Sequence, residues 1–235
     1  MEEIRSSTIL PGLREDIELH TSDSEVLVGE LSVPAVGKPV TTLIMLHPLP
    51  THGGFMDSHL IRKAANRLPA LIGAAVLRFN TRGTSSPRGA SSGHFSDGVS
   101  ESADVAAAVK FCLERGLPTP WLVGWSFGTE LAIKYGPDLE IIGAILLSPP
   151  LHRATDTDLL RWNEFGRPLI ALVPELDEYL DPVAAATRFA IVDHAEVFGF
   201  DQEKHLWVGE KATKRVLDKL AEVTVPGSSP LPTSF

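Results

Sequence analysis

Short apolar runs recur along this chain and alternate with amphipathic stretches. Continuous runs of this kind are typical of strands that are covered on both faces of a sheet. They fall at residues 43–46, 74–77, 122–123, 141–147 and 169–173. Apolar residues between them keep helical spacing, as at Leu60, Ala64 and Leu68, and again at Val105, Val109 and Cys112. Strands that alternate with helices predict a mostly parallel sheet.

The first and last parts of the chain show a different pattern of apolar and polar residues from the middle. Residues 17–21 and 26–33 alternate between apolar and polar, which predicts an antiparallel pair at the sheet edge. A last strand is predicted at 195–198 and a final helix around Val216, Leu220 and Val223. We therefore expect one α/β domain over 1–235, with about eight strands and helices on both faces. Residues 1–14 are interpreted as an arm and 225–235 as a loose tail.

Composition narrows the possible partners. The chain has 235 residues, of which 43% are hydrophobic and 22% charged, as in ordinary globular proteins. A net charge of -9 without a basic block argues against nucleic-acid or anionic-membrane binding. The acidic start lacks the apolar core of a secretory signal, and Cys112 is the only cysteine. We expect a cytoplasmic protein.

The clearest chemical motif is Gly124-x-Ser126-x-Gly128, directly after the run at 122–123. This spacing is typical of a nucleophile elbow, a sharp strand-to-helix turn that exposes a serine Oγ above the sheet. A side chain two residues before or after the serine would collide with a neighbouring element, so glycine stands there. The following helix would direct the free N–H of Phe127 toward an oxyanion.

A second oxyanion donor is expected on the loop after residues 43–46, which reads His47-Pro48-Leu49-Pro50-Thr51-His52-Gly53-Gly54. Proline has no N–H, so Pro48 and Pro50 are excluded. Leu49 is then the only donor between His47 and Thr51. The alternative interpretation is a rigid proline-rich turn without a catalytic role.

An acid is expected after the run at 169–173, where four carboxylates follow one another. Asp181 precedes Pro182 and is better explained as a helix N-cap. Asp177 lies just past the strand and is the preferred candidate. Glu175 is the alternative, whereas Glu178 is expected in solvent.

His205 follows the last predicted strand and precedes a helix, where it could act as general base for Ser126. The order Ser126, Asp177, His205 matches the order of this hydrolase architecture. The other histidines outside the oxyanion loop, including His152, are interpreted as structural or solvated. Arg78 and Arg82, after the run at 74–77, are expected to hold their loop, with binding of a substrate carboxylate as the alternative.

Other site predictions are weaker. Trp125, Phe127, Trp162 and Trp207 could line an apolar acyl pocket, and packing in the core is equally expected for each. His47 is a further candidate for substrate binding. The chain lacks the G-x-G-x-x-G and P-loop motifs, and its histidines show no metal spacing, so neither cofactor nor metal is expected.

Together these residues resemble the α/β-hydrolase superfamily over about residues 17–224. The chain is most similar in pattern to small, lid-poor bacterial members close to dienelactone-hydrolase-like and acyl-peptidase-like enzymes. The matching segments are His47-Pro48-Leu49-Pro50, Gly53-Gly54, Arg78–Gly83, Gly124–Gly128, Asp177–Pro182 and His205–Gly209. The resemblance implies the α/β-hydrolase fold with a Ser-Asp-His triad. Thr129-Glu130 departs from it, because a further small residue is usual there; we expect Glu130 to point away from Ser126.

The leading functional hypothesis is a serine hydrolase that cleaves a carboxylic ester or thioester of a small-molecule acyl substrate. An acyltransferase or a peptidase would use the same triad, and the sequence does not separate these activities. A non-catalytic binding protein on this fold is a third hypothesis. Residues 148–167 leave room for a short lid at most, and the oligomeric state is open.

Overall fold

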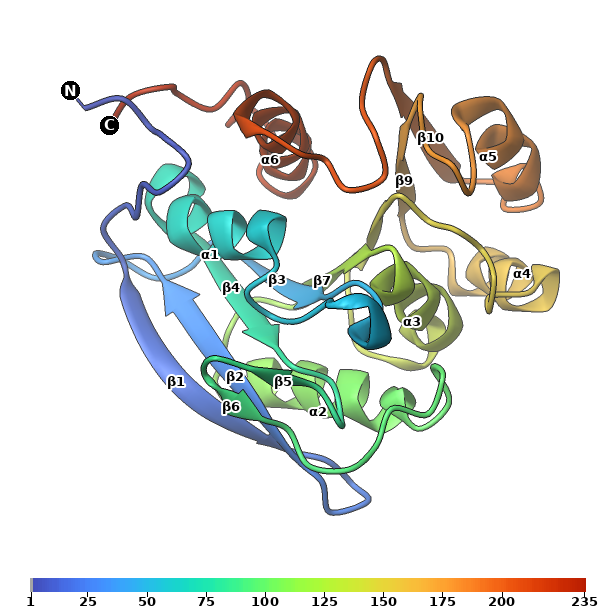
Figure 1. Cartoon of the computed structure of the whole chain (residues 1–235), viewed down its shortest axis with the longest axis horizontal. Helices are drawn as coiled ribbons and strands as arrows, with labels where there is room; N and C mark the ends of the chain where they lie inside the picture. The colour runs from blue at the N-terminus through green and yellow to red at the C-terminus, as the bar shows by residue number, and fades with distance from the viewer. Residues whose placement is uncertain (1) are drawn as a thin grey trace.

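The computed structural model describes residues 2–235, and its centre is one eight-stranded sheet (Figure 1). The strands are β1 (Leu13–His20), β2 (Val26–Val33), β3 (Thr41–Leu46), β4 (Ala74–Phe79), β7 (Pro120–Trp125), β8 (Gly143–Leu147), β9 (Leu169–Pro174) and β10 (Ala195–Phe200), in the order β1-β2-β4-β3-β7-β8-β9-β10. β1 and β2 pair antiparallel with each other, and β2 pairs antiparallel with β4. From β4 to β10 all neighbours are parallel. The predicted α/β class and the antiparallel edge are confirmed.

Helices cover both faces of this sheet, as expected. One face is packed by α1 (His59–Ile72) and α6 (Glu210–Thr224), and the other by α2 (Glu101–Glu114), α3 (Phe127–Tyr135), α4 (Asp156–Phe165) and α5 (Pro182–Phe189). One hydrophobic core lies on each face of the sheet, and successive side chains of β3 point alternately into the two cores. Leu43 and Met45 lie in the core on the side of α1, whereas Ile44 and Leu46 lie in the core on the other side. This double burial explains why the central strands read as continuous apolar runs.

Three short features lie outside this arrangement. A small hairpin of β5 (Ser85–Ser86) and β6 (Gly89–Ala90) follows β4, and the 3-10 helices η1 (Pro50–His52) and η2 (Gly136–Asp138) follow β3 and α3. α4 occupies half of the segment 148–167, in which a lid was possible. Its Trp162 is fully buried and donates from Nε1 to the carbonyl of Ile133, so α4 packs against α3.

The two ends of the chain lie together at one corner of the molecule (Figure 1). Glu3 and Ser234 form an antiparallel bridge, and the backbones of Glu2 and Phe235 exchange two hydrogen bonds of 2.9 Å. Leu231 is buried. We expected a loose tail from residue 225, and the structure instead pairs it with the N-terminal arm.

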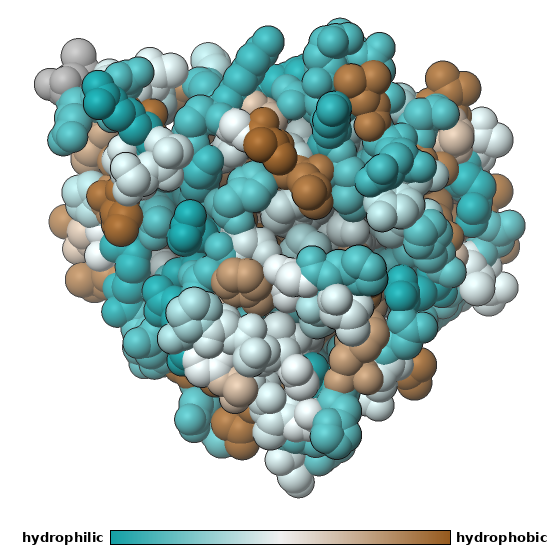
Figure 2. Space-filling view, in the orientation of Figure 1, coloured by the Kyte–Doolittle hydropathy of each residue, from teal (hydrophilic) through white to brown (hydrophobic). Residues whose placement is uncertain are grey.

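The face in Figure 2 is mainly hydrophilic, with its hydrophobic side chains in small, separate patches. Scattered single apolar side chains are normal on a protein surface. Over residues 2–235, none of the helices combines the length and the hydrophobicity that crossing a membrane requires.

Candidate active site

Ser126 occupies a strained turn between β7 and α3. Its backbone angles are φ 52° and ψ -115°, in a region that L-residues rarely adopt. A Cβ on Gly124 would lie 2.4 Å from the carbonyl oxygen of Gly128, and a Cβ on Gly128 would lie 2.2 Å from that of Leu46. Both positions therefore require glycine, for the steric reason that the motif suggests.

Three side chains from different strand ends meet at this turn. His205 Nε2 lies 2.9 Å from Ser126 Oγ, and His205 Nδ1 lies 2.9 Å from Asp177 Oδ2. The Asp177 and His205 side chains are 2% and 9% exposed, so their contact is shielded from water. The structure thus brings together the three residues that the sequence order selected.

The alternative acid, Glu175, has other partners. Its Oε2 accepts hydrogen bonds from the backbone and side-chain N–H groups of Gln202. Asp181 caps α5 by accepting from the N–H groups of Val183 and Ala184. The geometry therefore favours Asp177 as the partner of His205.

The backbone of His205 is held by buried side chains of two other strand ends. Its carbonyl accepts from Trp125 Nε1 at 3.2 Å and from Ser148 Oγ at 3.0 Å. Ser148 Oγ in turn accepts from Trp207 Nε1 at 2.8 Å. Trp125 and Trp207 thus fix the histidine loop.

The prediction that tryptophans line an acyl pocket is corrected by this arrangement. Trp125, Trp162 and Trp207 are at most 2% exposed, and all three lie outside the residues that line the pocket at Ser126. Each buried indole N–H has an acceptor in the protein interior. Phe127, by contrast, does line the pocket.

Two backbone N–H groups border the same pocket without a partner. Leu49 and Phe127 line the pocket beside Ser126, and neither N–H donates to any of residues 2–235. The Leu49 carbonyl accepts from the N–H groups of His52 and Gly54, which fixes the turn. An oxyanion at Ser126 would find two donors of the kind that such sites use.

His47 sets the direction of the Leu49 N–H. The buried His47 ring donates from Nδ1 to the Pro48 carbonyl at 2.7 Å, and Nε2 accepts from the Thr81 N–H at 3.1 Å. In a trans peptide the C=O and N–H point opposite ways. Holding the Pro48 carbonyl on one side therefore presents the Leu49 N–H on the other.

The same contacts correct the expectation that His47 binds substrate. The ring is 1% exposed and lies outside the pocket lining. Burial lowers the His47 pKa to about 4, so the imidazole is neutral near pH 7 and one ring nitrogen is free to accept. His47 is a positioning residue.

The pocket beside Ser126 has a volume of about 160 Å³ and contains residues that the sequence did not single out for binding. His152, which we interpreted as structural or solvated, Arg153 and Tyr179 line it. The Tyr179 ring lies edge-on to the His205 ring, with centroids 4.7 Å apart. His152 and Arg153 follow β8, so their position after a parallel strand end was the available signal. The remaining lining residues are Pro48, His52, Pro150 and Leu206.

Glu130 explains how His152 and Arg153 are held. Its buried carboxylate, one turn beyond Ser126 on α3, accepts from the backbone N–H groups of His152, Arg153 and Ala154 at 2.5–3.0 Å. The side chain is thus directed at the 152–154 loop. Three N–H groups on one carboxylate form a strong, charge-assisted anchor.

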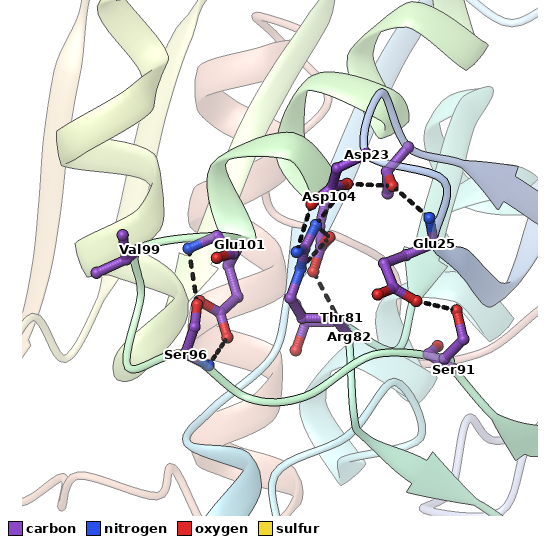
Figure 3. Close-up of polar contacts among 12 residues, drawn as sticks. Asp23, Glu25, Thr81, Arg82, Ser91, Ser96, Val99, Glu101 and Asp104 are labelled. Atoms are coloured by element: carbon purple, nitrogen blue, oxygen red, sulfur yellow. Dashed lines mark hydrogen bonds and ion pairs between the residues drawn. The ribbon is translucent and has the colours of Figure 1, made fainter.

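A second polar network holds the loop that packs on the elbow (Figure 3). Arg82 Nε lies 2.9 Å from Asp104, and Arg82 Nη1 lies 2.7 Å from Asp23. Hydrogen bonding to Arg82 holds the pKa of Asp23 well below its usual range, whereas burial raises that of Asp104 to about 6. The predicted structural role of Arg82 is confirmed.

Glu101 extends this network toward the site. Its carboxylate accepts from the N–H groups of Ser96 and Gly98 at 2.8 and 2.9 Å. The ring of Phe95, the residue before Ser96, packs edge-on against Phe127, with centroids 5.4 Å apart. The loop therefore supports Phe127, the residue that follows Ser126. Across residues 2–235, the His, Cys, Asp and Glu side chains form no cluster of three or more that could hold a metal.

Comparison with known proteins agrees with this geometry. Residues 43–230 match the Alpha/beta hydrolase family. An uncharacterized protein of Rickettsia prowazekii, RP471, is 33% identical over 113 residues, which cover 46% of this chain and 45% of that protein. The chain thus matches less than half the length of that curated relative.

Solved structures share the fold across nearly the whole chain. XC6422 from Xanthomonas campestris, described as an a/b serine hydrolase without lid, has 24% identity and a TM-score of 0.73, over 92% of this chain and 95% of its own. An alpha-beta serine hydrolase homologue from Coxiella burnetii has 21% identity and a TM-score of 0.74, over 89% and 96%. The Pyrococcus furiosus esterase Pf2001 has 19% identity and a TM-score of 0.72, over 91% and 93%. With the elbow, the sheet order and the family match in agreement, this chain belongs to the alpha/beta hydrolase family.

Proposed function

We propose that this protein is a serine hydrolase that cleaves a small carboxylic ester or thioester through an acyl-enzyme on Ser126. The supporting observation is the continuous contact from Ser126 Oγ to His205 Nε2 and from His205 Nδ1 to Asp177, with 2.9 Å at each step. Catalytic serines are recognised by this geometry and by the roles it permits. The Pyrococcus furiosus relative, described as an esterase, adds support from the same fold.

In the first half-reaction, Ser126 Oγ attacks the substrate carbonyl carbon and His205 Nε2 takes the hydroxyl proton. Asp177 accepts the Nδ1–H bond, keeps the imidazole in the required tautomer and stabilises the imidazolium. The N–H groups of Leu49 and Phe127 bind the oxyanion, assisted by the N-terminus of α3. The tetrahedral intermediate collapses, and His205 returns the proton to the leaving alcohol or thiol.

In the second half-reaction, His205 removes a proton from water, and the resulting nucleophile attacks the acyl carbonyl. Collapse of the second tetrahedral intermediate breaks the bond to Ser126 Oγ, which regains its proton from His205, and the acid departs. Tyr179 and Leu206, on the pocket rim, are 51% and 52% exposed. This open rim gives water access to the acyl-enzyme and therefore supports hydrolysis over acyl transfer to another acceptor.

The size of the pocket supports a short acyl group. A volume of about 160 Å³ is below the 300–1,000 Å³ typical of sites for drug-sized ligands. We expect p-nitrophenyl acetate and butyrate to be hydrolysed with a higher kcat/KM than p-nitrophenyl palmitate.

A fluorophosphonate probe tests the proposal directly. One equivalent is expected to label Ser126, located by peptide mass spectrometry, and Ser126→Ala is expected to abolish labelling and lower kcat more than ~10⁴-fold on the best ester. Ser7→Ala is a matched control, because Ser7 is exposed and lies outside the pocket lining, so this variant should keep both the label at Ser126 and the activity. A folded wild-type sample that neither reacts with the probe nor hydrolyses any ester of the panel would favour a non-catalytic binding protein.

A further inference from the structure

A second cavity lies at the corner where the chain ends meet. Its volume is about 200 Å³, and it is bounded by α1, α6, the N-terminal arm and the C-terminal tail. Figure 1 shows both termini beside these two helices. The cavity shares none of its lining residues with the Ser126 pocket, so it is a separate site.

Two buried cations of α1 share one carboxylate that lines this cavity. Lys63 and Arg67 both pair with Glu210 of α6, and Arg67 Nη2 lies 2.9 Å from Glu210 Oε2. The Lys63 and Arg67 side chains are only 9% and 4% exposed. Arg67 also has a buried Nε without a hydrogen-bond partner among residues 2–235. One buried positive charge of this pair is therefore left without a counter-charge.

The neighbouring charged groups do not supply that counter-charge. Glu3 pairs with Arg5 at 3.1 Å, and Lys214 pairs with Asp218 at 2.6 Å. Lys211, which also lines the cavity, forms no ion pair with any described residue. The charged residues in and around the cavity are Glu3, Arg5, Lys63, Arg67, Glu210, Lys211, Lys214 and Asp218. Together they carry an excess of two positive charges, on a chain whose net charge is -9.

The remaining wall of the cavity is apolar. Leu71 comes from the last turn of α1, Leu217 from α6 and Leu231 from the tail. A ligand with an apolar body could pack against these leucines while a negative end met Arg67 and Lys211. Burying a charge is costly unless it is paired, so an anion here would remove an existing penalty.

We propose that this cavity binds a small organic anion with an apolar body, of the class of medium-chain carboxylates. Such a ligand would contact Ile4 of the arm and Thr233 of the tail, which the cavity also includes. Because these two segments are hydrogen-bonded to each other, binding would stabilise the paired arrangement of the chain ends. The proposal does not depend on hydrolysis at Ser126.

Titration of the full chain with octanoate, followed by calorimetry and ¹H–¹⁵N NMR, tests the proposal. We expect one site at the cavity, with shifts of backbone amides in α6 and residues 231–234, and a raised Tm. Lys211→Glu is expected to weaken octanoate binding about tenfold. 1-Octanol, which lacks the charge, is expected to bind the wild-type protein at least about tenfold more weakly than octanoate does. Leu71→Trp should block binding by filling the cavity.

Lys38→Glu is the matched control. Lys38 is exposed, forms no ion pair with any described residue and lies outside the cavity lining, so the same charge change there should leave octanoate binding unaltered. The proposal is overturned if octanoate shifts only amides around Ser126, if Lys211→Glu and Lys38→Glu bind it equally, or if 1-octanol binds as tightly as octanoate.

Discussion

Two loops border the Ser126 pocket, and they are anchored over different distances along the chain. In the 47–54 loop, the Pro48 carbonyl is held by its neighbour His47, and the Leu49 carbonyl by N–H groups three and five residues later. In the 152–154 loop, the backbone is held by Glu130, 22–24 residues earlier. The first loop contributes Leu49, whose N–H has no partner among residues 2–235, and the second contributes His152 and Arg153.

This difference suggests a division of tasks. A locally fixed turn can hold one donor in one place, which is what stabilisation of an oxyanion requires. A loop fixed by a distant carboxylate can carry different side chains without changing the turn that holds it. We therefore expect the 47–54 loop to control kcat and the 152–154 loop to control KM, and the following substitutions test that comparison.

The largest effect is expected for His47→Phe. Phenylalanine fills the site but cannot hold the Pro48 carbonyl, so the Leu49 N–H would lose its direction. We expect kcat to fall about 10²-fold, the scale of losing one oxyanion donor, with KM nearly unchanged. Thr81→Val is the control, because it removes the hydroxyl contacts to His47 and Thr84 and leaves the Thr81 N–H bond to His47 intact. A kcat within threefold of wild type in His47→Phe would contradict the assigned role.

The pH dependence of stability should reveal the same histidine. The folded pKa of His47 is about 4, below the ordinary value of 6.5, so only the unfolded chain gains a proton between these values. Its contribution to the free energy of unfolding is therefore complete above pH 6.5 and is lost, by about 3 kcal/mol, as the pH falls to about 4.

The pKa shift of Asp104 changes the free energy of unfolding in the opposite direction, between pH 3.8 and about 6. Its folded pKa is raised from 3.8 to about 6, so its contribution favours the folded state more as the pH falls. Comparing wild type with His47→Phe cancels this effect, because Asp104 is present in both. Urea unfolding at pH 4.5, 5.5 and 7 should show the gap between the two proteins widening as the pH rises. A constant gap would contradict a neutral, buried His47.

A smaller effect on catalysis is expected for Glu130→Gln. The amide keeps one acceptor oxygen but loses the charge, so the three N–H groups of residues 152–154 are held less firmly. We expect KM for the best ester to rise about tenfold, with kcat within threefold, and the free energy of unfolding to fall by about 1–3 kcal/mol. Glu114→Gln, at an exposed ion pair on α2, is the control and should alter neither KM nor the free energy of unfolding. A change in kcat without a change in KM would contradict the expectation that the 152–154 loop controls KM.

Local sequence patterns are enough to predict the layers of the fold and the candidate reacting groups. Apolar runs mark strands that are covered on both faces, and this depends only on local pattern. The elbow is partly local, because Gly124 is required by a contact with Gly128 four residues later, whereas Gly128 is required by a contact with Leu46 of the neighbouring strand β3. Proline chemistry left Leu49 as the candidate donor, and the meeting of strand ends at one edge of a parallel sheet explains why Ser126, Asp177 and His205 lie together.

Contacts between groups far apart in the chain follow from the folded molecule and not from local sequence patterns. Trp125 and Trp207 are residues of the type that often lines an apolar pocket. In the structure, however, the Trp125 indole N–H donates to the His205 carbonyl and the Trp207 indole N–H donates to Ser148. Glu130, the 152–154 loop and the pairing of the two chain ends join segments without a shared local pattern. A buried polar group must find a partner, and which partner it finds depends on the packing of elements far apart in the chain.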